Sequence, residues 1–218
     1  MNSPLLPLLV LAGIAIFLIV RLRSVLGTRD GYEPPRNATV GRPDPRRDFE
    51  VIEGGPDRDI TDHVEDGTSA AKALAAMKMA EPGFSVSDFL SGARSAYEMI
   101  LMDFERGDLS DVSGFLGDDV REAFESVIAQ RAEQGLSIEA SFVGVRELTL
   151  SGATFDRDRA EADITVRFVG ELTSVVRNAD GEIVEGDPNE IKRQRDVWTF
   201  SRNMGGSDPN WMLVATDG

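Results

Sequence analysis

The stretch that decides the fold is Ala160-Glu-Ala-Asp-Ile-Thr-Val-Arg-Phe168. Apolar and polar residues alternate along it, as in a β-strand whose two faces meet different surroundings. The apolar face consists of Ala162, Ile164, Val166 and Phe168. The other face is polar, which indicates an antiparallel sheet with one buried side and one solvated side.

Further segments extend this sheet. The quoted strand continues to residue 176, and three other segments are also rich in β-branched and aromatic residues. These segments are residues 138–150, 192–202 and 211–216. Turn sequences at residues 178–181 and 205–210 connect neighbouring strands. We therefore predict a four-stranded antiparallel sheet.

Helical patterns precede the strands. Ser85 begins a capping box, and from Phe89 onward apolar residues recur at steps of three and four. Gly107 ends this helix, a short helix is expected over residues 108–116, and a third helix is expected over residues 118–135. Helices followed by an antiparallel meander predict an α+β fold in which the helices cover the apolar face of the sheet.

An uncharged apolar run occupies residues 4–20. As a helix it would span about 25 Å, slightly less than the ~30 Å hydrocarbon core, and the arginines that follow can snorkel to the headgroups. A cleaved signal peptide would need a basic segment before the run and small residues after it, and this run is followed by Arg-Leu-Arg. We therefore expect an uncleaved transmembrane anchor with a basic flank over residues 1–27. Its anchor residues are Leu5, Leu9, Ile14, Phe17, Val20, Arg21 and Arg23.

The basic residues near the anchor give its orientation. Arg21, Arg23 and Arg29 all follow the apolar run, and residues 1–29 contain no acid. The positive-inside rule then places the rest of the chain on the cytoplasmic side of a single-pass membrane protein.

Composition divides the remaining chain into three parts. Residues 28–67 are rich in proline, glycine and charge, which predicts a flexible acidic linker in which His63 is solvated. Residues 68–83 are rich in alanine, which predicts a connecting helix. This helix could contact a membrane or partner, but with only two lysines we favour packing on its own domain. The globular domain is expected over residues 84–218.

The charge and composition exclude several classes of function. The net charge is −15, from 38 acidic and 23 basic side chains, so the body would repel nucleic acid. The chain has no cysteine and one histidine, which excludes thiolate metal sites, disulfides and multi-histidine centres.

Isolated acids remain as candidates for acid–base chemistry. Glu98 and Asp103 fall off the apolar stripe of the first long helix and are expected to be solvated. Asp163 and Arg167 share the polar face of a strand and are expected to lie outside. Because no nucleophile–base pair, phosphate-binding loop or metal cluster can be assembled, we expect no enzyme activity, no cofactor and no metal.

Aromatic residues could line an apolar pocket between the helices and the sheet. These candidates are Tyr97, Phe104, Phe124, Phe142, Phe168, Trp198 and Trp211. With only fifteen aromatic residues in the chain, we favour filling of the core, and an open cavity above about 300 Å³ would change that preference.

Several short elements follow one another along the chain, at residues 89–100, 104–109, 120–124, 128–131, 186–188, 196–200 and 208–216. In this order and spacing they resemble the Tim44-like domain family. With the anchor and the Arg-Leu-Arg flank, the layout is most similar to that of the alphaproteobacterial TimA-type adaptors. The resemblance implies a curved antiparallel sheet wrapped by helices, a cone of the nuclear-transport-factor-2-like or cystatin-like type. It also implies a scaffold at the bacterial inner (cytoplasmic) membrane.

This chain departs from the family pattern in one respect. The mitochondrial relative binds an Hsp70 chaperone and carries basic amphipathic segments before its domain, whereas residues 30–83 of this chain are acidic. We therefore expect the bilayer to be contacted through residues 4–20 rather than through a basic helix.

The leading hypothesis is a non-catalytic adaptor that recruits protein partners, such as a chaperone or an inner-membrane complex. The alternatives are an accessory or assembly subunit of an inner-membrane complex, and a module that binds an apolar small ligand or lipid.

Overall fold

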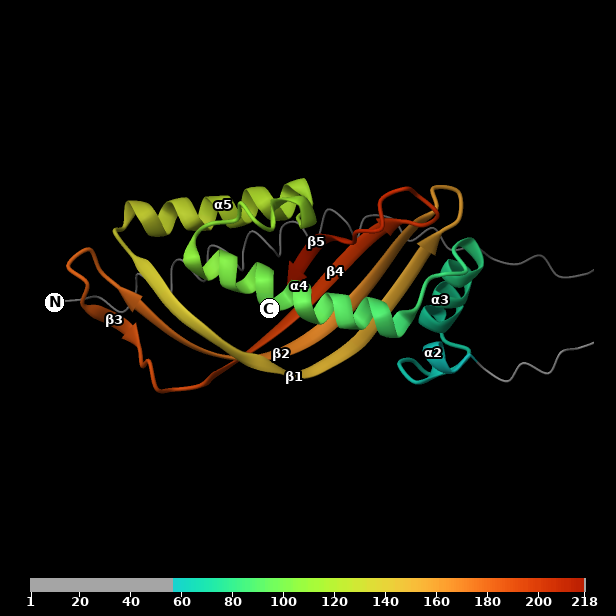
Figure 1. The fold of residues 1–218 in the computed structure, drawn as a ribbon, viewed down its shortest axis with the longest axis horizontal. Helices are drawn as coiled ribbons and strands as arrows, with labels where there is room; N and C mark the ends of the chain where they lie inside the picture. Colours follow the sequence, from blue (N-terminus) through green and yellow to red (C-terminus); the bar gives the residue numbers. More distant parts are fainter. Residues whose placement is uncertain (1–56, 218) are drawn as a thin grey trace, which may run out of the picture. The chain divides into compact units, whose positions relative to one another are not determined.

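Helices come first and strands second in the computed structural model, which describes residues 57–217 (Figure 1). The helices are α2 (Arg58–Thr61), α3 (Ser69–Ala80), α4 (Val86–Arg106) and α5 (Asp118–Glu133), with a 3-10 turn η1 (Ser113–Phe115). The strands are β1 (Ser137–Asp156), β2 (Glu161–Arg177), β3 (Ile183–Gly186), β4 (Lys192–Asn203) and β5 (Met212–Asp217). The α+β class predicted from the sequence is confirmed.

The sheet is antiparallel and has the order β1-β2-β4-β5. The predicted number of four strands is wrong, because the short strand β3 adds a fifth by pairing with the end of β2 that β4 does not reach. Gly186 makes this pairing possible, since its φ is +89° and a Cβ there would lie 2.3 Å from the carbonyl oxygen of Ser174. Strand β3 has four residues, all exposed, so no alternation of burial marks it.

Helix α4, the longest helix between residues 57 and 217, lies within the bend of the sheet, and β1 and β2 curve around it (Figure 1). Ser85 caps it by accepting a hydrogen bond from the Asp88 backbone N–H at 3.2 Å, and Gly107 ends it in the left-handed conformation at φ +77°. The apolar stripe of α4 and the apolar face of β2 meet in one hydrophobic core, as the sequence predicted.

The helix expected over residues 108–116 is not formed, apart from the three-residue turn η1. Asp108 accepts a hydrogen bond from the Ser110 backbone N–H at 3.0 Å, a local turn that competes with helix. The segment is instead held by Leu109, Val112 and Leu116, which are buried. Gly117 then donates to the Leu213 carbonyl at 2.8 Å, which ties this segment to β5.

The folded domain begins before the predicted boundary, because residues 57–67 are not a flexible linker. Ile60 of α2 is buried in the core. The Asp59 carboxylate accepts hydrogen bonds from the backbone N–H groups of Val86 (2.8 Å) and Ser87 (2.9 Å), and it pairs with Lys78 at 2.7 Å. The rest of the linker predicted over residues 28–67, that is residues 28–56, lies outside the described residues.

The connecting helix is confirmed as α3. Leu74 and Met77 are fully buried, so the helix packs on its own domain. His63 is half-buried, and its Nε2 lies 3.3 Å from the Ser87 hydroxyl, so the expectation that it is merely solvated is wrong.

No helix between residues 57 and 217 is long and apolar enough to cross a membrane. The predicted anchor, from Leu5 to Arg23, lies outside the described residues and stays a prediction.

Candidate partner-binding groove

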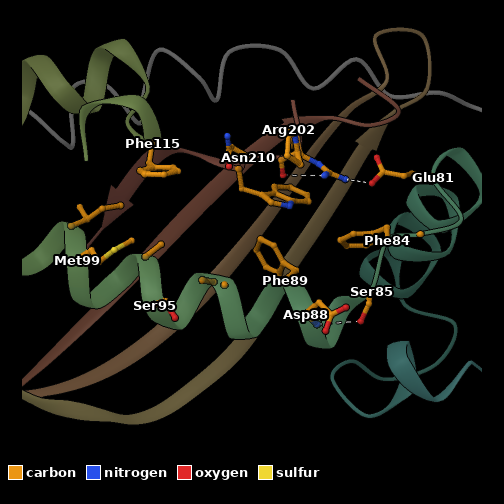
Figure 2. A pocket seen from close by; sticks show the side chains of 17 residues that line it. Glu81, Phe84, Ser85, Asp88, Phe89, Ser95, Met99, Phe115, Arg202 and Asn210 are labelled. Carbon is orange, nitrogen blue, oxygen red and sulfur yellow. Dashed lines mark hydrogen bonds and ion pairs between the residues drawn. The ribbon is translucent and has the colours of Figure 1, made fainter. Parts of the chain in front are cut away.

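An open cavity of about 370 Å³ lies along one flank of α4, between this helix, η1 and the end of β4 with the loop that follows it (Figure 2). Its walls come from the turn before α4, from η1 and from the loop between β4 and β5. The apolar lining consists of Phe84, Phe89, Ala93, Ala96, Met99, Ile100, Phe115 and Trp211. Residues from four parts of the chain therefore form one apolar concavity.

Small residues on α4 keep this cavity open. Gly92, Ala93 and Ala96 line it on consecutive turns of the helix. A Cβ added at Gly92 would have no atom within 4 Å, so the space above this residue is empty. The floor of the cavity is thus close to the helix backbone.

Trp211 forms the aromatic wall of the cavity. Its ring packs against Phe89, with a centroid separation of 4.7 Å, and against Phe84, with a separation of 5.9 Å. Aromatic pairs at these distances are stabilising and hold each other in fixed orientations. The wall is therefore preformed.

An ion pair fixes the loop that carries Trp211. Arg202 binds the Glu81 carboxylate at 2.7 Å, donates to the Pro209 carbonyl at 3.1 Å, and lies over the Trp211 ring at 5.1 Å (Figure 2). The other Glu81 oxygen accepts from the Gly205 backbone N–H at 2.9 Å. This hydrogen bond has the largest effect on the pKa of Glu81, which it lowers. Arg202 lowers the pKa further, and burial opposes the shift.

A second cavity, of about 430 Å³, continues the first along α4. The two cavities share Ser95 and Met99. The remaining lining residues of the second cavity are Glu98, Met102, Asp103, Arg106, Asp111 and Val112. We refer to the two cavities together as the α4 groove.

Asp103 lies at the buried edge of this groove, which corrects the prediction that it is solvated. Asp103 is only 4 % exposed, and its carboxylate forms an ion pair with Arg106. Burial raises the pKa of Asp103, the Arg106 guanidinium opposes this, and the nearby carboxylates of Asp111 and Asp108 add to it. Glu98 is exposed, as predicted. Asp163 and Arg167 both lie on the polar face of β2, where Asp163 is half-buried and Arg167 is exposed.

The α4 groove has an excess of negative charge. Its basic residues, Arg106 and Arg202, are each paired with an acid of the groove. Three other carboxylates line it, and they belong to Asp88, Glu98 and Asp111. All three are exposed, and none forms an ion pair with a base between residues 57 and 217. The rim of the groove is therefore acidic.

Between α4 and the sheet, aromatic side chains fill the core, the arrangement that the sequence analysis favoured over an apolar pocket. Tyr97 stacks on Phe168 with a centroid separation of 4.4 Å and lies 4.8 Å from Trp198, and all three are buried. Phe104, Phe124 and Phe142 are half-buried at the edge of the core. Of the seven candidate residues for a pocket or core lining, Trp211 is the one that lines the α4 groove.

The structure contains a buried polar pair that the sequence analysis did not predict. The Tyr97 hydroxyl donates to the Asp196 carboxylate at 2.5 Å, and the second Asp196 oxygen accepts from the Gln194 amide at 3.1 Å. Burial raises the pKa of Tyr97, and the negative charge of Asp196 raises it further. Since the partners are 99 residues apart and belong to different elements, no local pattern could have joined them.

Comparison with known proteins identifies the family. A family model described as the Tim44-like domain matches residues 70–218. The chain belongs to the Tim44-like domain family. The resemblance in the ordered sequence elements is thereby confirmed, and the match includes α3, the helix before the predicted start of the domain.

A curated relative supports this membership. The human protein named mitochondrial import inner membrane translocase subunit TIM44 is 26% identical over 171 residues, which cover 72% of this chain. The matched segment spans only 36% of the human protein. A solved structure of the intermembrane space region of the chloroplast protein ARC6 covers 66% of this chain and 94% of its own, with 13% identity and a TM-score of 0.33. That TM-score is too low to support an inference.

Proposed function

We propose that this protein is a non-catalytic adaptor that positions protein partners at a membrane, with the α4 groove as its docking surface. The groove supports this proposal most directly. It is preformed and open, and its first cavity is largely apolar, in a chain of the Tim44-like domain family. The human relative is named as a subunit of an inner membrane translocase, which makes protein translocation the first process in which to seek partners.

The membrane part of the proposal rests on sequence. Residues 4–20 would anchor the chain in a bacterial inner membrane, and residues 28–56 would tether the domain, in the layout of the TimA-type adaptors. The domain would lie in the cytoplasm, and its curved sheet would be a cone of the nuclear-transport-factor-2-like type. A tether of this kind raises the local concentration of the domain at the bilayer, which strengthens binding to partners there without new contacts.

Site-specific crosslinking in native membranes tests the adaptor function. A photoreactive amino acid replaces Ser95 in the groove or, as the matched control, Glu190 in the exposed loop after β3. We expect partner proteins to be crosslinked through position 95 and not through position 190. Equal products at both positions, or none at position 95, would contradict the proposal.

Protease treatment of spheroplasts tests the orientation. We expect the domain to be protected until the inner membrane is opened. Digestion by protease added outside would place the domain on the other side and contradict the proposed topology.

One observation favours a second function, the binding of an apolar small ligand. The first cavity, at about 370 Å³, reaches the size range of ligand pockets. Native mass spectrometry of the purified chain distinguishes the two, because a bound small molecule of fixed mass would support the ligand function. A protein that remains in fixed stoichiometry through detergent chromatography would instead indicate an accessory subunit.

A further inference from the structure

The chemistry of the α4 groove points to one kind of occupant, and this inference rests on the proposed adaptor function. We propose that the groove binds a cationic amphipathic α-helix of a partner protein. The occupant's apolar face would lie over Ala96 and Met99, and its basic face would meet the acidic rim.

The length of the groove fits a helix of about twenty residues. The lining residues on α4 run from Ser85, its cap, to Arg106, its last residue. At 1.5 Å per residue this distance is about 30 Å, the length of a twenty-residue helix. The groove therefore matches a whole helix rather than a short anchor.

The floor of the groove favours a helix over an extended peptide. A strand binds well when it finds unpaired backbone groups on a sheet edge, and the floor here is a helix whose backbone hydrogen bonds are internal. A helical occupant satisfies its own backbone and needs only apolar contact with the floor.

The side chains of the floor suit such contact. Met99 is 47 % exposed, and Met102 lies one turn further along the groove. Methionine is flexible and polarisable, so it adapts to different apolar faces. Gly92 and Ala96 leave room for larger residues of the partner.

The charge of the rim selects a basic partner. The carboxylates of Asp88, Glu98 and Asp111 have no basic partner between residues 57 and 217, so lysine or arginine of an occupant can pair with them. The same charge disfavours other occupants, because nucleic acid, anionic lipid and a second copy of this chain, with its net charge of −15, would all be repelled.

A binding experiment with a defined peptide tests the inference. The probe is a fluorescein-labelled peptide of eighteen leucine and lysine residues, with leucine at steps of three and four. The full chain is placed in nanodiscs of zwitterionic lipid, and fluorescence anisotropy is corrected for binding to empty nanodiscs. We expect saturable binding that weakens as salt rises from 50 to 300 mM, because rim charges are screened.

Three comparisons make the test specific. A scrambled peptide of the same composition and a leucine–glutamate peptide should bind at least tenfold more weakly. The double variant Glu98→Lys/Asp111→Lys should weaken binding of the basic peptide at least tenfold and strengthen binding of the acidic one. The double variant Glu185→Lys/Glu190→Lys makes the same change in net charge on exposed residues outside the groove, and it should change binding less than twofold.

Some results would overturn the inference. Equal loss in both double variants would show attraction by net charge alone, and unchanged binding in Met99→Glu would place the peptide elsewhere. A dimer in sedimentation that Met99→Glu disrupts would assign the groove to a second copy. If position 95 crosslinks protein partners but the basic peptide does not bind, the adaptor function stands and the partner chemistry is wrong.

Discussion

Tyr97 of α4 and Asp196 of β4 are joined by a buried hydrogen bond of 2.5 Å. This bond connects α4 to the centre of the sheet. It runs beneath the α4 groove, since Tyr97 points toward the sheet while Ser95 and Met99 line the opposite side of the helix. The pair therefore fixes the element on which the groove is built.

Removing the hydroxyl in Tyr97→Phe should reduce the free energy of unfolding by about 2–3 kcal/mol. A hydrogen bond to a charged group is lost, and the Asp196 carboxylate keeps only Gln194 as a side-chain partner. Urea denaturation measures the change. In the double variant with Asp196→Asn the losses should be less than additive, because the two residues interact directly. Full additivity, or a loss below 0.5 kcal/mol, would contradict the importance of the pair.

Gly170→Ala should disturb the same region of the core. A Cβ at this position of β2 would lie 2.7 Å from the Tyr97 hydroxyl oxygen, so the ring would have to shift. We expect a loss of about 1–3 kcal/mol. The matched control is Gly92→Ala, where a Cβ meets nothing within 4 Å and alanine favours the helix. That variant should gain up to about 1 kcal/mol, and thermal unfolding should show opposite shifts for the two.

Tyr97 and Asp103 show which features of α4 could be predicted from the sequence and which could not. The apolar period of α4 placed Tyr97 in the core correctly, because a regular helix fixes which face each residue occupies. The same period placed Asp103 in solvent, and that was wrong. The segment after α4 folds back over its last turns with Val112 buried beside the second cavity, and periodicity carries no information about such a neighbour.

The groove was unpredictable for a related reason. It joins Phe84, Phe115, Arg202 and Trp211, which lie in four separate parts of the chain. Periodicity indicates which side of α4 faces the core, but not that the neighbouring flank of the helix is bordered by η1 and the loop before β5. The Tim44-like elements could be found from sequence because their order is linear, whereas the groove depends on tertiary arrangement.

Asp59→Ala should loosen the start of the domain. The carboxylate accepts hydrogen bonds from backbone N–H groups at the beginning of α4 and pairs with Lys78. We expect a loss of about 1–2 kcal/mol, the size of a helix-cap deletion. Limited proteolysis should then cut residues 57–67 sooner than in the parent chain. Asp62→Ala, at an exposed residue of the same segment, is the control and should change neither measurement.

The Glu81 ion pair should make stability depend on acid pH. The pKa of Glu81 is lowered on folding, first by the Gly205 N–H and then by Arg202, so its stabilisation is present above the ordinary glutamate value of about 4.3 and is lost as pH falls through the folded value. At pH 7, Glu81→Gln should cost about 1–2 kcal/mol. The parent and variant should converge well below pH 4, and urea titrations across this range measure the difference. If the parent and Glu81→Gln differed in stability by the same amount at every pH, the loss would come from packing rather than from the ion pair.

Asp103, in the same groove, should affect the pH dependence of stability in the opposite direction to Glu81. Burial raises the pKa of Asp103, Arg106 opposes this shift, and Asp111 and Asp108 add to it. At neutral pH the folded state therefore holds an ionised carboxylate in an unfavourable environment, which lowers the free energy of unfolding. This cost is present above the folded pKa and absent below the unfolded value of about 3.9. Asp103→Asn removes it, and the variant should be equal to the parent or up to about 1 kcal/mol more stable at pH 7, with the gain vanishing at acid pH. Urea titrations at pH 7 and pH 3 test this. A loss above 0.5 kcal/mol at pH 7 would show that the Arg106 pair outweighs the burial of the carboxylate.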